Sequence, residues 1–220
     1  RLPLVDQVGV MMDAGALATV GLQPESDPLN LALQVPLDAA PDLWQMAVGS
    51  LGSLDDLYKG NPTRQAAVRK FVIARLSPKF AQLGWETREG DSTTTRQLRT
   101  ALVSTLGGLG DAAVLAEARR RFDAFLADPR TLSPELRRTV LGMVARNADA
   151  ATWDKLHALA KAEKSSMLRD QYYSLLAMAK DKTLAQRALD LALTDEPGAT
   201  NGAGMISAVS WEHPDLAFDF

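Results

Sequence analysis

The sequence predicts an all-α fold in which antiparallel helix pairs stack into an α-α superhelix, or solenoid. Apolar residues recur at helical spacing along most of the chain, and almost no segment shows the alternation typical of a strand. An acid-led restart recurs at residues 110–114, 148–152 and 180–184 and, in degenerate form, at 212–216. Positions 111, 149, 181 and 213 are separated by 38, 32 and 32 residues, a period typical of two-helix repeats of the HEAT and armadillo kind.

The N-terminal part is predicted to be helical but irregular. A helix is expected from about Leu4 to Val20, ending at Gly21, because glycine commonly terminates helices. Proline interrupts a helix beyond its first turn, so four prolines confine the following stretch to short pieces. They are Pro24, Pro28, Pro36 and Pro41.

A long helix is predicted to start at Asn61-Pro62, because asparagine caps helices and proline suits their first turn. We expect a break or kink near Ser77-Pro78 and an end at Gly84-Trp85. Its stripe comprises Val68, Phe71, Val72, Arg75, Leu76 and Phe80. Gly90-Asp91-Ser92 then provides a turn and an N-cap for a helix that carries Leu98, Leu102 and Leu106.

The C-terminal part is more regular. Ser133 is the expected N-cap of a helix with Pro134 at its first position, and Glu196-Pro197-Gly198 is the expected break before a weak helix over 199–210. The predicted buried stripes of successive helices are Val114, Ala118, Phe122 and Phe125; Leu136, Val140, Met143 and Val144; Trp153, Leu156 and Ala160; Leu168, Tyr172, Leu175 and Met178; and Leu184, Ala188 and Leu191.

Composition is that of an ordinary folded chain, with 46% hydrophobic and 23% charged residues among 220. No linker is long or polar enough to force a boundary, so residues 1–220 are predicted to form a single helical-repeat domain. The chain begins and stops in mid-pattern, which we interpret as the mark of a C-terminal fragment of a larger multidomain chain.

Charge and hydropathy exclude several partners. The net charge of −3 and the pI near 5.5 disfavour nucleic acid, which needs a basic face. No apolar run reaches the roughly 18 residues that span a bilayer, and the first residues do not resemble a signal peptide. The absence of cysteine excludes disulfides and thiolate metal ligands but does not indicate a compartment.

No catalytic, metal-binding or cofactor-binding residue is predicted in this chain. The two histidines, His157 and His213, are too far apart for a His-Glu-x-x-His zinc helix. We expect His157 to be a half-buried or surface residue beside the Trp153 stripe, and His213 to be an N-cap or turn residue before Pro214. The chain has no nucleophile elbow and no phosphate-binding glycine loop.

Two clusters have both a functional and a structural interpretation. The arginines could form a carboxylate or phosphate patch, but the interleaved acids favour a solvated face of ion pairs. The arginines are Arg119, Arg120, Arg121, Arg130, Arg137, Arg138 and Arg146, and the acids are Glu117, Asp123, Asp128 and Glu135. Tyr172 and Tyr173, with Trp153, could line a ligand groove, but their helical spacing favours core anchors.

Several segments, in the same order, resemble the C-terminal helical domain of aminopeptidase N and of endoplasmic-reticulum-type aminopeptidases. The resemblance covers nearly the whole chain. It is carried by 6–18, 84–85 with 90–92, 106–111, 117–122, 132–137 with Val140, Trp153, Arg169, 180–181 and 213–220. The string 202–205 also resembles the Gly-x-Met-Glu-Asn loop of zinc exopeptidases, but Ile206 and Ser207 replace the glutamate and asparagine, so we reject it as a substrate loop.

The resemblance implies that this chain is a non-catalytic domain of a zinc-dependent aminopeptidase. In that family an upstream domain of the same chain holds the zinc and the catalytic glutamates, and the helical domain closes over it as the wall of a peptide-substrate chamber. No cofactor is therefore expected here. Arg169 is the candidate for binding a peptide carboxylate, with pairing to Asp170 or Asp181 as the structural alternative.

Two other function classes remain open. A free-standing helical-repeat scaffold that binds peptides or proteins would have the same sequence pattern. An α-helical enzyme could use acid pairs such as Asp55-Asp56 or Asp13 with Glu25, although adjacent residues on a helix do not converge on one site.

Overall fold

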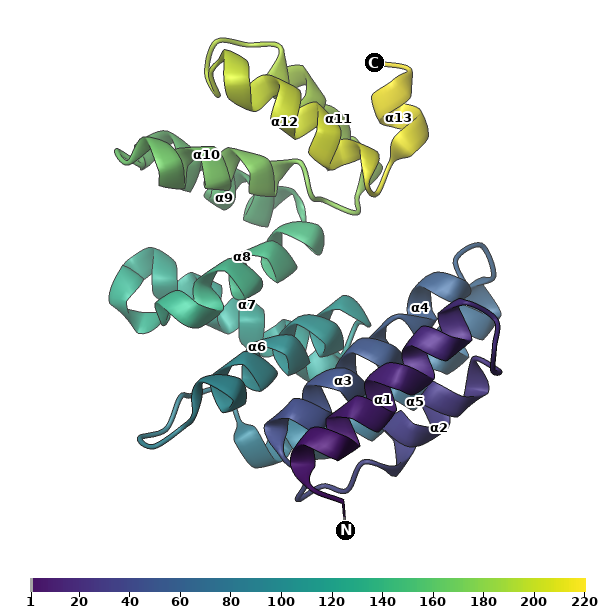
Figure 1. The fold of residues 1–220 in the computed structure, drawn as a ribbon. Helices are drawn as coiled ribbons and strands as arrows, with labels where there is room; N and C mark the ends of the chain where they lie inside the picture. The colour runs from purple at the N-terminus through teal and green to yellow at the C-terminus, as the bar shows by residue number, and fades with distance from the viewer. Residues whose placement is uncertain (1) are drawn as a thin grey trace. The chain divides into compact units, whose positions relative to one another are not determined.

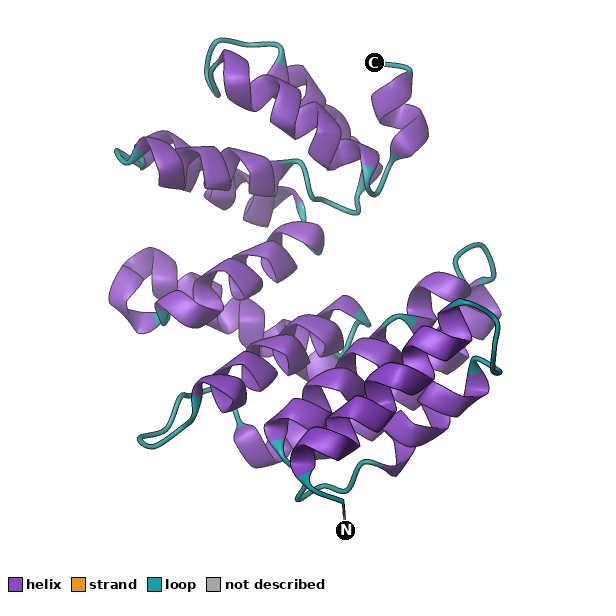
Figure 2. Cartoon of the chain, viewed as in Figure 1, coloured by secondary structure: helices purple, strands orange, loops and turns teal. Residues whose placement is uncertain are grey.

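Residues 2–220 are described by a computed structural model, and every regular element among them is a helix (Figure 2). The prediction of an all-α fold is therefore confirmed. The chain divides into two compact units at residues 114 and 115, and each is described by itself. The single domain over 1–220 stays a prediction.

The first unit is organised around its third helix. Its elements are α1 (Leu4–Thr19), α2 (Ser26–Gln34), α3 (Pro41–Gly52), α4 (Leu54–Leu57), α5 (Pro62–Leu83) and α6 (Thr93–Gly108). Helix α3 packs against α1, α2, α5 and α6 (Figure 1) and buries Trp44, Ala47 and Leu51 completely. As predicted, α1 ends just before Gly21, whose φ of 73° suits glycine.

Helix α5 begins as predicted, but its course differs from the prediction. The side chain of Asn61 accepts a hydrogen bond from the backbone N–H of Arg64. A break or kink was predicted near Ser77-Pro78. The prediction of a break was wrong, because α5 continues through Pro78 to Leu83. Val72, Leu76 and Lys79 are buried on both sides of the proline, and this packing holds the helix together. Phe71, which belongs to the predicted apolar stripe of this helix, is half exposed and so lies at the edge of the packed face.

The turn before α6 is held by a buried arginine. Ser92 caps α6 by accepting a hydrogen bond from the N–H of Thr95, as predicted. Arg99 is only 1% exposed, and its guanidinium donates to Asp91 at 2.5 Å and to the carbonyl of Gly84 at 3.2 Å. One buried charge therefore ties the whole turn over 84–92 to the core of the unit.

The second unit consists of helix pairs in sequence order. Its elements are α7 (Ala112–Ala127), the 3-10 turn η1 (Pro129–Thr131), α8 (Pro134–Arg146), α9 (Ala150–Ala162), α10 (Ser166–Leu176), α11 (Lys182–Ala192), α12 (Ala199–Ser210) and α13 (Pro214–Phe218). Helix α9 packs on α10, and α11 packs on α12 (Figure 1). This arrangement confirms the predicted helical repeat.

The recurring acid has a structural role. Asp111, Asp149 and Asp181 each accept a hydrogen bond from the backbone N–H three residues later, at 2.8 to 3.0 Å. They therefore satisfy N–H groups that the first turns of α7, α9 and α11 leave free. His213 precedes α13 without such a side-chain bond, and its Nε2 lies 3.0 Å from the carbonyl of Ala179 instead.

The predicted stripes of α7, α8 and α9 are buried, whereas that of α10 is only partly so. Tyr172 is buried, but Leu168, Leu175 and Met178 retain intermediate exposure. Tyr173 and Leu176 each follow a residue of this stripe by one position, and both are buried in the core. The apolar face of α10 is thus shared between the core and a surface groove.

Within the described residues, no single helix is long and apolar enough to cross a bilayer, and α6 with α7 passes that test only as a bent pair.

Candidate functional site

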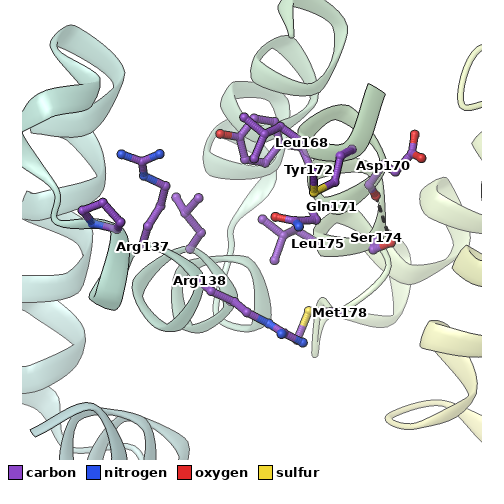
Figure 3. A pocket seen from close by; sticks show the side chains of 13 residues that line it. Arg137, Arg138, Leu168, Asp170, Gln171, Tyr172, Ser174, Leu175 and Met178 are labelled. Atoms are coloured by element: carbon purple, nitrogen blue, oxygen red, sulfur yellow. Dashed lines mark hydrogen bonds between the residues drawn. The ribbon is translucent and has the colours of Figure 1, made fainter. Parts of the chain in front are cut away.

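A groove of about 660 Å³ runs between α8 and α10 in the second unit (Figure 3). Its apolar lining comes mainly from the partly buried stripe of α10, where Leu168, Tyr172 and Leu175 are four and three residues apart. Leu141 of α8 and Met178 beyond the end of α10 complete the apolar lining. The groove therefore offers an apolar side chain a place to bury.

Two adjacent arginines of α8, Arg137 and Arg138, line the same groove and point in different directions (Figure 3). The guanidinium of Arg137 lies 5.4 Å from the centre of the Phe125 ring and donates weakly to backbone carbonyls, at 3.4 Å. Its Nε is buried without a hydrogen-bond partner. Packing against the ring holds this side chain in place and leaves hydrogen-bonding capacity unused.

Arg138 is the freer of the two cations. It is exposed, and among residues 2–220 it has neither an ion-pair nor a hydrogen-bond partner. The predicted network of ion pairs does form elsewhere, since Glu117 binds both Arg120 and Arg121, and Asp128 binds Arg130. Two arginines, Arg137 and Arg138, and one carboxylate, that of Asp170, therefore line the groove.

Polar groups of α10 line the groove on its other side. The carboxylate of Asp170 accepts a hydrogen bond from the side-chain amide of Asn201 at 2.6 Å, and Ser174 donates to the backbone carbonyl of Asp170. Burial raises the pKa of the Tyr172 hydroxyl, and the charge of Glu163 raises it further, so this group stays neutral. The α10 side of the groove therefore combines a carboxylate and neutral hydroxyl groups with its apolar side chains.

The aromatic cluster named from the sequence is divided between core and groove. Trp153 is buried, and its indole N–H donates to the carbonyl of Leu176 at 3.1 Å. Tyr172 and Tyr173 are both buried, but Tyr172 also lines the groove and Tyr173 does not. The sequence does not distinguish the roles of the two tyrosines, because both lie at helical spacing from apolar neighbours.

His157 is half-buried, as predicted, and belongs to a polar cluster with Glu196. Its Nε2 lies 2.5 Å from Oε1 of Glu196, which also accepts a hydrogen bond from the Tyr173 hydroxyl at 3.0 Å. Lys161 lies 3.3 Å from the other carboxylate oxygen. Burial alone would raise the pKa of Glu196, but the hydrogen bonds from His157, Tyr173 and Lys161 outweigh it and hold this pKa below its ordinary value.

Arg169 is exposed on α10 and does not line the groove. Within the described residues it forms no ion pair with Asp170 or Asp181, because Asp170 binds Asn201 and Asp181 caps α11. Burial and Glu196 raise the pKa of the Tyr173 hydroxyl to about 12, and the charge of Arg169 partly opposes this increase. Its role in binding a peptide carboxylate stays a prediction.

No group of three or more His, Asp or Glu side chains in residues 2–220 is arranged to hold a metal ion. The residues present therefore do not fit a zinc site.

Comparison with known proteins connects the whole chain to one family. The model of the ERAP1-like C-terminal domain matches residues 1–220. Aminopeptidase M1 of Arabidopsis thaliana is 28% identical over 99% of this chain, and Aminopeptidase M1-C of Oryza sativa subsp. japonica is 26% identical over 100% of this chain. Aminopeptidase 2 of Candida albicans is 28% identical over 71% of the chain. The chain spans only 25%, 26% and 17% of these three proteins, respectively.

Proposed function

Because the chain belongs to the ERAP1-like C-terminal domain family, we propose that it is the non-catalytic C-terminal domain of a zinc-dependent aminopeptidase. The observation that carries the proposal is that the whole chain is similar to a segment of proteins named as aminopeptidases, and that this segment makes up about a quarter of each of them. The parent would remove amino-terminal residues from peptides, and its other three quarters would supply the catalytic groups.

The zinc belongs, in this proposal, to the upstream part of the parent. The described residues do not fit a metal site, so no step of the reaction is assigned to them. Their contribution is to bind and to orient, which suits a stack of helices that presents an extended surface without an enclosed catalytic pocket.

The domain is proposed to close over the catalytic domain and to form the wall of the chamber that holds the peptide. The groove between α8 and α10 supports a binding role, because it combines apolar side chains with the unpaired cation of Arg138. An extended peptide could place an apolar side chain in this groove and an anionic group beside the arginines. Such a contact would lie far from the scissile bond and would affect long peptides more than short ones.

The test compares the full-length parent with a variant that lacks residues 1–220. The parent is expected to contain zinc and to cleave amino-terminal residues. The truncated variant, if it still binds zinc, is expected to lose its dependence on peptide length while it continues to cleave a single-residue chromogenic substrate. A parent without zinc or aminopeptidase activity would overturn the proposal in favour of a free-standing peptide-binding or protein-binding scaffold.

A further inference from the structure

The first helix of the chain exposes its large apolar residues and buries its small ones. Ala14 and Ala18 are the buried positions of α1, one helical turn apart. Val5 and Met12 are 74% and 62% exposed. A surface helix of an isolated domain normally has the opposite arrangement, with its large apolar side chains against the core.

The exposed residues form one continuous face. Val5, Met12, Ala16 and Thr19 are exposed and separated by seven, four and three residues, which places them on one side of a helix. Val8 and Gly9, at intermediate exposure, lie between them. We refer to these six residues as the outer face of α1.

No charged side chain lies on the outer face. Helix α1 contains only two charged residues, Asp6 and Asp13, and each directly follows a residue of the face. Asp6 and Asp13 lie three residues before and four residues after Gly9, so both carboxylates border one edge of the face. Exposed helix faces are ordinarily charged, and an uncharged apolar face of this length is typical of a surface that another protein segment covers.

Residues 2–114, the described part of the first unit, leave this face exposed. Helix α1 packs against α2 and α3 through its alanine side and lies in front of them in Figure 1. Beside the outer face, Val10 and Leu17 of α1 line a shallow groove of about 440 Å³ shared with Leu31 of α2. Asp13, Gln23, Asp27 and Asn30 line the same groove, so the surface toward α2 is polar and the exposed apolar face belongs to α1 alone.

We propose that the outer face of α1 packs against an apolar surface in the upstream part of the parent aminopeptidase. This inference rests on the proposed function. The chain spans 25% of Aminopeptidase M1, so three quarters of a protein of that kind lie outside these residues and could supply the partner surface. Domains of one chain stay in a fixed arrangement where their interface is hydrophobic, as obligate protein interfaces are, and the apolar composition of this helix face suits such a contact.

The test places a photo-crosslinking amino acid, p-benzoylphenylalanine, at position 12 of the full-length parent. Mass spectrometry of the irradiated protein is expected to find crosslinks between position 12 and peptides that come from the part of the parent before residue 1. The control carries the same crosslinker at Leu193, which is 73% exposed but lies outside α1 and is expected to give little crosslink to those peptides.

Two results would overturn the proposal. A crosslink to a second copy, seen as a band of doubled mass, would make the outer face a dimer contact. A yield at position 12 no higher than at position 193 would mean that nothing specific covers the helix.

A second measurement does not depend on the crosslinker. Val5→Lys with Met12→Lys in the full-length parent is expected to speed amide exchange in α1 by at least severalfold, because two buried ammonium groups would open the interface. Leu193→Lys is the matched control, and equal exchange of α1 in both proteins would contradict the proposal. Since aminopeptidase activity is assayed separately on the unmodified parent, an inactive parent would refute the proposed function while the crosslink still reports on the contact.

Discussion

The imidazole Nε2 of His157 lies 2.5 Å from Oε1 of Glu196, thirty-nine positions later in the chain. This contact joins α9 to the turn that leads into α12. The Tyr173 hydroxyl donates to the same oxygen from α10. Two helices and one turn of the second unit therefore meet at one carboxylate.

Glu196→Gln is expected to lower the free energy of unfolding by about 1–2 kcal/mol near pH 6, because it weakens charge-assisted hydrogen bonds. The pKa of Glu196 is lowered in the folded protein, even though burial opposes this, by bonds from His157, Tyr173 and Lys161. Its stabilising effect is therefore present above the pKa of the unfolded state and is lost as pH falls through the folded pKa. Urea unfolding at about pH 6 and pH 3 should show the deficit of the variant shrinking at the lower pH, and a constant deficit would contradict this account.

Arg99→Met is expected to destabilise the protein by about 3 kcal/mol or more, because it leaves Asp91 and the carbonyl of Gly84 without their buried partner. Gln97→Met, two positions away on the exposed side of α6, serves as the control and should change stability by less than about 0.5 kcal/mol. Chemical denaturation of both variants measures the difference. Equal stabilities would mean that the turn over 84–92 is held by other contacts.

Gly202→Ala and Gly204→Ala form a matched pair on α12 with opposite expected effects. A Cβ at position 202 would lie 2.5 Å from the backbone carbonyl oxygen of Ala192, so this variant should lose about 1–3 kcal/mol. A Cβ at position 204 would meet nothing within 4 Å, and alanine there should stabilise the helix by about 0.5–1 kcal/mol. Thermal unfolding of the two proteins would contradict this reasoning if both variants moved in the same direction.

Arg138→Glu in the full-length parent is expected to raise KM for long peptides by about tenfold and to leave a single-residue substrate unaffected, because it reverses the unpaired charge of the groove. Arg169→Glu tests the carboxylate-binding residue proposed from the sequence, and the same selective change in KM is expected if that role is correct. Lys164→Glu, exposed and outside the groove lining, is the control. Unchanged long-peptide kinetics with unchanged folding would remove either arginine from the proposed binding surface.

The partly buried stripe of α10 shows where prediction from sequence reaches its limit. Leu168, Leu175 and Met178 have the spacing of core residues, and that spacing correctly predicted the helix. Whether such a stripe is sealed or left open depends on how far α8 lies from α10, which is a long-range distance. The groove could therefore be found only in the tertiary structure.

The glycine at position 202 shows the same limit from the other direction. The sequence permitted the rejection of a substrate loop at 202–205, but it offered no positive reason for the glycine. The structure supplies one, since Gly202 lets α12 approach the backbone of Ala192 in α11.

The sequence by itself determined the all-α class, the helical repeat and most helix ends, because these depend on interactions within a few residues. Asp111, Asp149 and Asp181 cap the helices that follow them, and apolar residues three or four apart select the faces that pack. Only the tertiary structure decided which faces are left uncovered. The open groove and the His157–Glu196 contact depend on the packing of helices and residues that are distant in sequence. The exposed outer face of α1 depends on the absence of a packing partner among the described residues of its unit. No local sequence pattern encodes either kind of long-range packing.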